Sequence, residues 1–397
     1  MSDAEALFPY TRSRECPYDP PPRARNLERP VRVRIWDGSS PWLVTSYEDV
    51  QRVLSDDEHF SADPRQPGYP EKSAAYGATV AYDRNLRSMD NPEHDENKRL
   101  VVRFFTAKYV ESQRSRIRSA ADELLAHMAV LSAPVDLVEE FALALPIRVI
   151  CGILGVPFAD REFFASRSRL CFGDASAEIA AQAGAELSEY IDKLIDRTSP
   201  SGLNLIGHLQ ATAYSKGKLS RTDFVGLIRL ILMAGHETTA NMIGLSVLLL
   251  LERREYFQRL KHSPELIPNA VEELLRYLTV GQVGRRRAVI KDVLIGGQAF
   301  KPGDGVIVAE NVANRDNRVF DDPNDLKFER PNASTHLAFG FGIHQCLGQQ
   351  LTRVELQVAL ERLLAVFPTL RLEQSADDLR FNDHGLVYGV KELIVAW

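Results

Sequence analysis

One segment of thirteen residues, 336–348, constrains this chain more than any other: HLAFGFGIHQCLG. Its cysteine, Cys346, has three glycines close by and is followed at once by an apolar helical stripe of Leu347, Leu351, Val354 and Val358. A cysteine at a helix start faces the positive end of the helix dipole, which favours the thiolate. Glycines let the backbone approach a bulky flat ligand closely. The segment therefore predicts a thiolate metal ligand, and a haem iron is the candidate.

Two other interpretations of this cysteine stay open from the residues alone. A lone cysteine is usually a small buried apolar residue. A zinc site with His336 and His344 is the second, although structural zinc takes four N/S ligands and the chain has no second cysteine pair. The remaining cysteines, Cys16, Cys151 and Cys171, are expected to be inert packing residues. Such sparse cysteine predicts a reducing, cytoplasmic location without disulfides.

The composition excludes several classes of protein. Hydrophobic residues make up 45% of the 397, enough for a large core. Lys and Arg number 48 against 54 Asp and Glu, a net charge of −6, and no block of like charge indicates nucleic-acid binding. Residues 1–22 contain no apolar stretch, so neither a signal peptide nor a membrane anchor is expected.

The pattern along the chain is mainly helical with a small β region. Alternating residues near 31–60 and 287–310 predict strands with turns between them. The stretch 65–90, with its prolines and glycines, predicts a loop. No repeat or long linker divides the chain, so we expect one domain spanning 1–397, mainly α with small β-sheets.

A helix of roughly 30 residues, or about 45 Å, is predicted at 222–251, with Ser220 as its N-cap. Its flanks are apolar but its middle is AGHETTAN, and a membrane span would not place Glu237 there. A buried glutamate is costly without a task or a partner. Thr238 is expected to donate to the carbonyl of Ala234 and open the helix, while Gly235 leaves room against the backbone. A simple kink is the competing interpretation.

Segment 336–348 resembles the haem-ligand loop of the cytochromes P450, whose pattern is Phe-Gly-x-Gly-x-His/Arg-x-Cys-x-Gly. Every fixed position is filled, by Phe339, Gly340, Gly342, His344, Cys346 and Gly348. The resemblance spans essentially the whole chain and is to the soluble bacterial class, of actinobacterial type. It implies the triangular helical prism of that family and a haem b cofactor. Cys346 would then be the proximal iron ligand, with Phe339 and Gly340 beside it and His344 on a propionate.

The same resemblance assigns roles to the centre of the long helix. The residues match the family's Ala/Gly-Gly-x-Asp/Glu-Thr, the segment that crosses the distal face of the haem. Ala234 would lie against the cofactor. By resemblance, Glu237 relays protons and Thr238 holds bound dioxygen.

Charged residues complete the resemblance. The matches to the family's propionate donors are His94, Lys98 and Arg287. The family usually has arginine where Lys98 stands, and lysine offers a point charge instead of a two-pronged fork. In isolation, Glu273 and Arg276 would be an ordinary surface pair. By resemblance they form a buried structural pair that Arg330 completes.

The activity implied is that of a haem-thiolate monooxygenase, which inserts one oxygen atom of O2 into a hydrophobic organic substrate by hydroxylation or epoxidation. Thiolate ligation favours O–O cleavage. The chain shows no dinucleotide, flavin or iron–sulfur motif, so electrons are expected from a ferredoxin and its reductase. The cations near the proximal face that would attract such an acidic partner are Arg103, Lys108 and Arg353. The alternatives are a haem-thiolate nitric oxide reductase or peroxygenase, which tend to lose the acid–alcohol pair, and a non-catalytic haem sensor.

The substrate is not named by the sequence. Residues expected to line its pocket are Tyr82, Leu232, His236, Val283 and Val387. Their surroundings are mostly apolar, which predicts a mid-sized hydrophobic molecule, with Tyr82, Gln282 and His236 as polar contacts. His236 either orients the substrate or points away from it.

Overall fold

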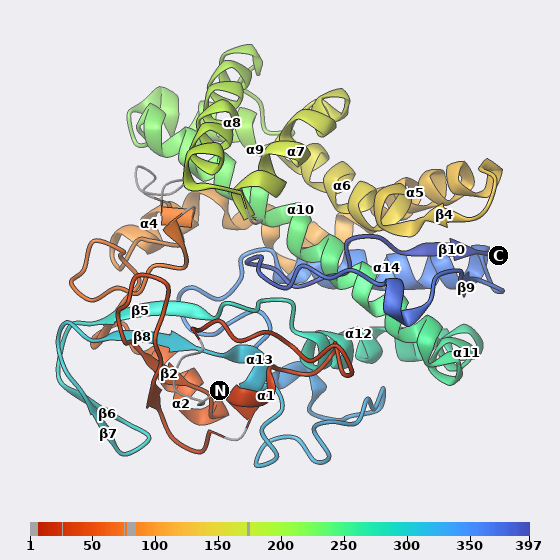
Figure 1. Cartoon of the computed structure of the whole chain (residues 1–397). Coiled ribbons are helices and arrows are strands. Elements are labelled where there is room, and N and C mark those ends of the chain that lie inside the picture. Colours follow the sequence, from red (N-terminus) through yellow and green to blue (C-terminus); the bar gives the residue numbers. More distant parts are fainter. Residues whose placement is uncertain (1–6, 26, 75, 78–84, 173–174) are drawn as a thin grey trace.

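Long helices that pack around a central one, α10, form most of the molecule (Figure 1). The computed structural model describes residues 7–25, 27–74, 76–77, 85–172 and 175–397. The long helices are α5 (Ala107–Val130), α6 (Ala144–Leu154), α7 (Arg161–Phe172), α8 (Ala177–Arg197), α10 (Arg221–Glu252), α12 (Ile267–Leu278) and α14 (Gln349–Val366). The shorter ones are α1 (Pro22–Arg25), α2 (Tyr47–Ser55), α4 (Glu93–Val101), α9 (Leu205–Thr212), α11 (Arg254–His262) and α13 (Glu310–Ala313).

Helix α10 begins where its sequence predicts. The Ser220 side chain accepts a hydrogen bond from the Asp223 N–H and so satisfies one of the free donors of the first turn. The helix ends at Glu252, where the Arg253 N–H still donates to the Leu249 carbonyl. It packs against α6, α8, α12 and α14, and its apolar side chains join theirs in the largest core of the protein. The element that runs through the middle of the molecule is therefore in contact with most of the helical layer.

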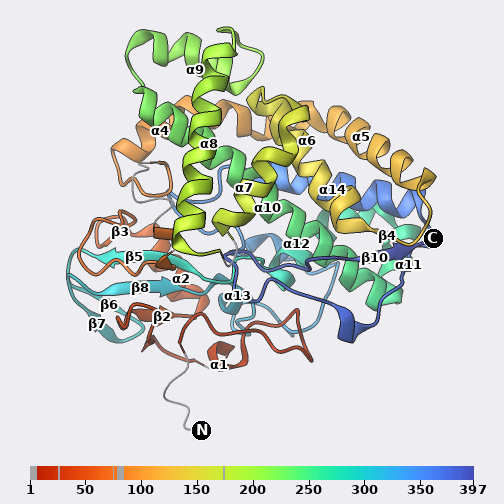
Figure 2. The same ribbon diagram turned by 45° about the horizontal axis from the view of Figure 1, so that its top comes forward.

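The two regions predicted as β meet in one five-stranded sheet, which lies to one side of the helices (Figure 2). Its strand order is β1 (Val31–Arg32), β2 (Trp42–Val44), β8 (Gly305–Val308), β5 (Arg285–Val289) and β3 (Phe60–Ser61). Strands β2 and β8 are parallel, with Trp42 opposite Val306, and the other pairs are antiparallel. Two smaller sheets contain β4 (Val135–Asp136), β10 (Ile394–Ala396) and β9 (Arg371–Leu372), and β6 (Val293–Ile295) and β7 (Gln298–Phe300).

Three buried clusters hold these layers together. The largest fills the space between α5, α6, α10, α12 and α14. A second lies between the five-stranded sheet and α2, and a third packs the N-terminal segment on β1, β2 and β8. Among the described helices, none combines the length and apolarity that a bilayer span needs.

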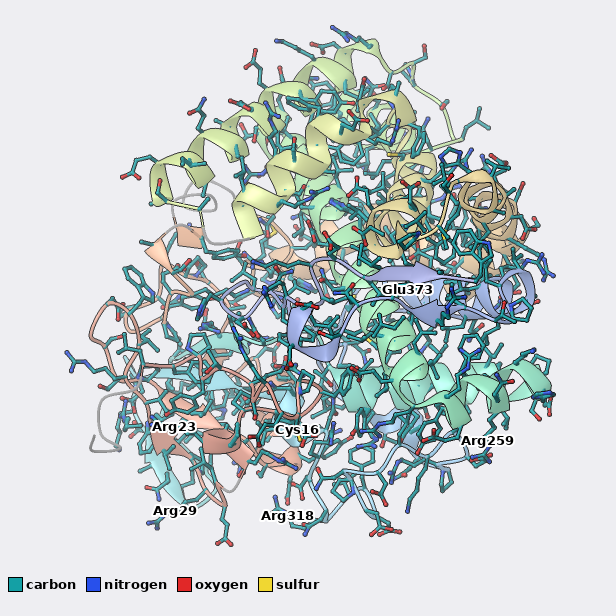
Figure 3. All side chains as sticks on the ribbon, turned by 45° about the vertical axis from the view of Figure 1, so that its right-hand side comes forward. Cys16, Arg23, Arg29, Arg259, Arg318 and Glu373 are labelled. Carbon is teal, nitrogen blue, oxygen red and sulfur yellow. The ribbon has the colours of Figure 1, made fainter. Side chains whose placement is uncertain are left out.

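Charged side chains gather on the outside, where Figure 3 labels Arg23, Arg259 and Arg318. Cys16 lies there too: it is exposed, in a turn in which its carbonyl accepts from the Asp19 N–H. The prediction of a packing role for Cys16 is therefore wrong, because this turn precedes α1 on the surface. Cys151 and Cys171 are buried free thiols, as expected. The described part of 65–90 consists mainly of turns.

Candidate active site

The segment 336–348 forms a tight loop that ends at the N-terminus of α14. The Cys346 N–H donates to the Phe339 carbonyl at 2.9 Å, and Gly348 is the N-cap residue of the helix. Gly340 and Gly342 have φ values of 71° and 72°, in the left-handed region. A Cβ at Gly340 would lie 2.5 Å from Arg285 Nε, and one at Gly342 would lie 2.3 Å from the Leu54 carbonyl oxygen. Both positions therefore require glycine for conformation and for space.

The thiol of Cys346 is not made acidic by its surroundings. Burial raises its pKa, and this effect outweighs the Arg285 guanidinium, the Gly348 N–H and the Arg353 guanidinium, which lower it. Burial therefore opposes the thiolate that the helix start is expected to favour. A bound metal cation is what deprotonates a thiol in such a place.

Three nitrogen donors converge beside this loop, from His94, Arg287 and His344, which we call the donor set. The rings of His94 and His344 lie 4.5 Å apart. Burial lowers the pKa of His344, and the nearby Arg287 and His94 lower it further. In the described part of the chain, Arg287 Nη2 and His344 Nε2 are buried without a hydrogen-bond partner, and His94 Nδ1 has only Asp95, at 3.6 Å. Lys98 Nζ donates to the Ile343 carbonyl at 2.9 Å.

Buried donors without partners are rare in folded proteins and require an explanation. Carboxylates placed beside the donor set would supply the missing acceptors. A haem carries two propionates, so the residues present fit that cofactor.

The centre of α10 is open to an internal space although the helix is central. Ala234 is exposed, and Glu237 and Thr238 are half-buried, between buried neighbours on both sides. Helix α10 packs against α14, and the hydroxyls of Thr239 and Thr352 lie 3.3 Å apart across that contact. The centre of α10 thus packs against α14, the helix that follows the cysteine loop.

The predicted back-bond of Thr238 is present, since its hydroxyl donates to the Ala234 carbonyl at 3.1 Å. The predicted opening of the helix is not, because α10 is continuous from Arg221 to Glu252. The space beside Gly235 is also taken: a Cβ there would lie 2.8 Å from Ile150 of α6. Gly235 therefore allows close helix packing and does not make room for a ligand.

Two titratable residues occupy neighbouring positions of α10 in different surroundings. Burial raises the pKa of Glu237, while Arg169 and an Asn241 side-chain hydrogen bond lower it. His236 is fully buried, and desolvation lowers its pKa to about 4, so it is neutral. Its Nδ1 lies 2.7 Å from the Leu232 carbonyl, and its ring contacts that of Phe164 on α7. His236 therefore faces the α7 side of the helix.

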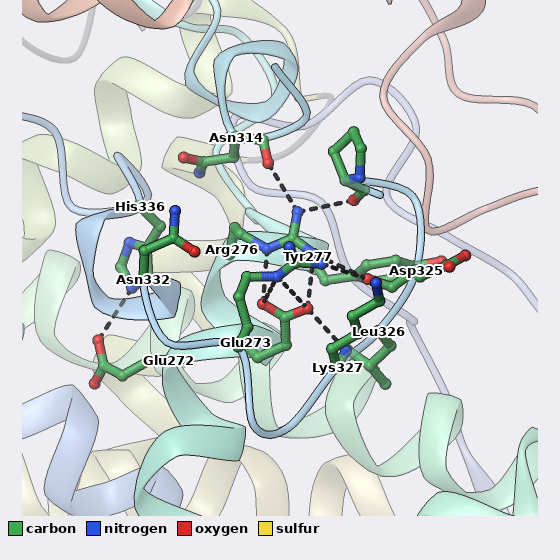
Figure 4. A network of polar contacts seen from close by, with 12 residues as sticks. Glu272, Glu273, Arg276, Tyr277, Asn314, Asp325, Leu326, Lys327, Asn332 and His336 are labelled. Carbon is green, nitrogen blue, oxygen red and sulfur yellow. Dashed lines mark hydrogen bonds and ion pairs between the residues drawn. The ribbon is translucent and has the colours of Figure 1, made fainter. Parts of the chain in front are cut away.

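A buried network surrounds Glu273 beneath the loop (Figure 4). The Arg276 guanidinium donates to this carboxylate at 2.7 and 2.8 Å, Arg330 donates at 2.9 and 3.0 Å, and the Lys327 N–H donates at 2.9 Å. The remaining donors of Arg276 bind the carbonyls of Asn314, Pro323 and Asp325. The three charged side chains are 0–3% exposed, which excludes the surface-pair interpretation. We call Glu273, Arg276 and Arg330 the glutamate network.

A second pair beside it was missed from the sequence. Glu272 binds Arg353 at 2.7 and 3.0 Å and lies 3.3 Å from His336, and the Arg353 guanidinium lies 4.7 Å from the Phe339 ring centre. Arg353 was expected on a docking surface, but it is 17% exposed and paired, because it follows the loop on the inner side of α14. A signal was available, since Glu272 adjoins Glu273 on the same helix.

The expected pocket residues differ in what they can contact. Tyr82 lies outside the described residues. Leu232 and Val283 are buried, and Val387 is half-buried, paired in an isolated bridge with Gly281. Gln282 was expected to contact substrate, but its amide donates to the carbonyls of Asn382, Asp383 and Gly385. Its donors are therefore used to position the C-terminal segment.

The zinc interpretation of the loop finds no ligands. Across the residues that the structure describes, no three His, Cys, Asp or Glu side chains meet in a cluster able to hold a metal ion.

Comparison with known proteins gives a consistent result. Residues 154–396 match the Cytochrome P450 family model. The chain is 43% identical to cytochrome P450-SU2 of Streptomyces griseolus and 41% identical to cytochrome P450 GfsF of Streptomyces halstedii. Both matches cover 98% of this chain and 96% of the relative.

The fold is also that of solved structures. The GfsF crystal structure matches with a TM-score of 0.92 at 39% identity, covering 99% of this chain and 100% of that one. The mycinamicin VIII C21 methyl hydroxylase of Micromonospora griseorubida also gives 0.92, at 37% identity with the same coverage. The predicted helical fold with small sheets is thus confirmed. The chain belongs to the cytochrome P450 family, and it is a haem-thiolate monooxygenase.

Proposed function

We propose that the cofactor is haem b with Cys346 as the sulfur ligand of its iron, and that electrons come from a ferredoxin and its reductase. The observation that carries this proposal is the convergence of unsatisfied donors from His94, Arg287 and His344 beside the half-buried thiol of Cys346. When bound, thiolate-ligated haem supplies the reductive activation of dioxygen. The oxygen atom is then inserted by hydroxylation or epoxidation.

The loop residues hold and tune the cofactor in this proposal. Arg287, His344 and His94 bind the propionates, and Lys98 retains N–H donors for them beyond the one given to Ile343. The Gly348 N–H lowers the proton affinity of the sulfur. Phe339 and Gly340 lie beside the cysteine, and Ala234 faces the cofactor from α10. The glutamate network keeps the segment before the loop rigid.

Glu237 and Thr238 have the roles of proton donor and hydrogen-bond acceptor at the centre of α10. Because the Thr238 hydroxyl gives its hydrogen to the Ala234 carbonyl, Oγ1 is an acceptor toward the internal space. Burial raises the pKa of Glu237, so its carboxyl exchanges protons nearer neutral pH than an exposed glutamate does. The intact acid–alcohol pair favours a monooxygenase over a nitric oxide reductase, a peroxygenase or a haem sensor.

The substrate is a mid-sized hydrophobic molecule of the natural-product class. Relatives carry names such as mycinamicin VIII C21 methyl hydroxylase, vitamin D3 dihydroxylase and pentalenic acid synthase. Leu232, Val283 and Val387 surround it with apolar surface, and His236 positions the α7 side. Arg103 and Lys108, exposed before and at the start of α5, attract the acidic ferredoxin. The chain works as one domain in the cytoplasm, where its four cysteines stay free.

Turnover tests the function directly. With added ferredoxin, reductase and NADPH, substrate-dependent NADPH use should yield a product with one atom from ¹⁸O2. Consumption of nitric oxide with NADH alone would instead establish the reductase. Product formation driven by peroxide but never by the electron donors would establish the peroxygenase.

The role of Thr238 has its own test. Thr238→Ala removes the acceptor oxygen and keeps the helix, because alanine is the best helix former. Oxygen consumption should then exceed product severalfold, while the binding of haem stays normal. Thr238→Ser keeps the hydroxyl and should restore most of the coupling. Tight coupling in the alanine variant would remove Thr238 from the mechanism.

A further inference from the structure

Three partly buried cations near the cysteine loop have no role in the proposed function. Lys72 and Arg87 belong to the segment 69–87, and Arg285 is the first residue of β5; we call them the cation cluster. All three are half-buried. The like charges of Arg87, Arg286 and Arg285 add to burial in lowering the pKa of Lys72, and the carboxylate of Glu310 only partly opposes them. The local field is therefore positive.

The cluster keeps donors that the protein does not use. In the described part of the chain, no carboxylate lies within ion-pairing distance of Lys72 or Arg87, and buried Arg87 Nε has no hydrogen-bond partner. Both cations instead lie over the ring of Tyr76, each 4.6 Å from its centre. Glu71 and Tyr69 act on Arg87 only at longer range. Arg285 is paired with Glu310 at 2.7 Å.

The cluster is placed at the edge of the cysteine loop. Arg285 reaches Gly340, as the 2.5 Å distance from a Cβ there to its Nε shows. Alternate residues of a strand point to opposite faces, so Arg285 and Arg287 share one face and Arg286 lies on the other. From that other face, Arg286 donates to the Pro70 carbonyl at 3.2 Å and so fixes the chain two residues before Lys72.

Long cationic side chains usually carry their charge out to water. Here two of them are held over one ring, beside a third, with no counter-ion from the described residues. Retaining such charges inside a protein is costly unless an anion completes the site. In the proposed function the haem propionates take their donors from the donor set and Lys98. The cation cluster adjoins the donor set, because Arg285 lowers the pKa of His344 and the backbone of Leu86, next to Arg87, hydrogen-bonds to the His344 ring.

We propose that the cation cluster binds an anionic group of the substrate, so that the enzyme acts on a hydrophobic carboxylate. Lys72 supplies a point charge and Arg87 a fork that matches two carboxylate oxygens. The apolar remainder of the molecule extends toward Val283 and Val387. This inference rests on the proposed function, because it takes the space beside the cysteine loop as the substrate cavity.

The test compares hydrophobic carboxylic acids with their own methyl esters on the haem-loaded enzyme. Binding is followed by the substrate-induced shift of the haem spectrum and, independently, by calorimetry. At least one acid should bind about tenfold more tightly than its ester, as expected for a charge-assisted contact. Esters that bind as well as or better than their acids throughout the panel would overturn the proposal.

Variants locate the effect. Lys72→Gln and Arg87→Gln should each remove most of the acid preference, and Lys72→Arg should keep it. The matched control is Lys216→Gln, an exposed lysine between α9 and α10, which loses the same charge and should leave the preference unchanged. If Lys72→Gln and Arg87→Gln instead release haem, the cluster serves the cofactor and the proposal is wrong.

Calorimetry keeps this proposal separate from the proposed function, because it needs no haem signal. A preference for acids that depends on Lys72, in a protein that lacks the thiolate spectrum, would contradict the proposed function and support the anion site. A normal thiolate spectrum and turnover, together with tighter binding of esters than of acids, would support the proposed function and contradict the anion site.

Discussion

The glutamate network and the donor set are both buried groups of charged and polar side chains near the same loop, and they differ in how far the protein satisfies them. Around Glu273, every strong donor has an acceptor supplied by the chain. Around Arg287, His344 and His94, donors remain without partners among the described residues. A satisfied network stabilises one conformation. A network with unpaired buried donors indicates a site where a ligand supplies the missing acceptors.

The largest effect should come from replacing the sulfur of Cys346 in the loop near both regions. Cys346→Ser should abolish turnover and the red-displaced carbon monoxide band of thiolate coordination, because a serine hydroxyl does not replace the thiolate. Cys171→Ser is the control, a buried thiol far from the loop in sequence, and it should keep the band. Retention of the band in Cys346→Ser would mean that another atom binds the iron.

Breaking the satisfied network should cost the most stability. Glu273→Gln leaves the two arginines Arg276 and Arg330 buried beside a neutral amide, so we expect a loss of about 3–5 kcal/mol in the free energy of unfolding. Urea unfolding of the haem-free protein measures it. Glu329→Gln breaks an exposed pair with Arg259 and should cost less than about 1 kcal/mol. Equal losses in the two variants would show that burial of the network is not what matters.

Mutation of the donor set should change haem binding more than the stability of the haem-free protein. Arg287→Gln removes a buried charge that has a free donor, so the haem-free protein should unfold within about 1 kcal/mol of the parent. Haem, however, should leave about tenfold faster, as followed by its transfer to a haem-scavenging protein. A large loss of haem-free stability with unchanged haem release would reverse the comparison.

A smaller, pH-dependent effect concerns Glu355 on α14, which belongs to neither region. It is 1% exposed, and burial raises its pKa well above the usual value. The folded state thus binds this proton more tightly than the unfolded state, so stability falls as the pH rises from about 4.3 toward the folded pKa. Glu355→Gln removes that titration.

Urea unfolding of Glu355→Gln and its parent at several pH values measures the effect. The variant should gain on the parent by up to about 1.4 kcal/mol per pH unit across that interval. Parallel pH profiles would show that Glu355 keeps its proton in both states or in neither.

Much of the site was predictable because its signals are local. The long helix was expected at 222–251 and spans Arg221–Glu252, since its cap and its apolar flanks lie in one stretch. The back-bond of Thr238 depends on a residue four positions away. Glu273 and Arg276 lie about one helical turn apart on the same helix. A single loop contains Cys346 and its glycines.

What could not be predicted depends on contacts between distant segments. The space beside Gly235 is occupied by Ile150 of another helix. The amide of Gln282 is hydrogen-bonded to a segment about a hundred residues later. The pKa of Cys346 follows from burial, which no window of sequence reports. The contact of Arg285 with Gly340 requires the register of β5, which is fixed by its pairing with β8.

That register has a consequence for how the chain can change. Arg285 and Arg287 face the cysteine loop while Arg286 turns to Pro70, and pairing of Arg286 with Ile307 holds this order. One inserted residue between Gly281 and Arg285 would rotate the triplet, so that a single arginine faced inward where two do now. Insertions should thus be tolerated in the surface turns but should abolish activity between Gly281 and Arg285. Active variants obtained by laboratory evolution should therefore keep the length of this segment.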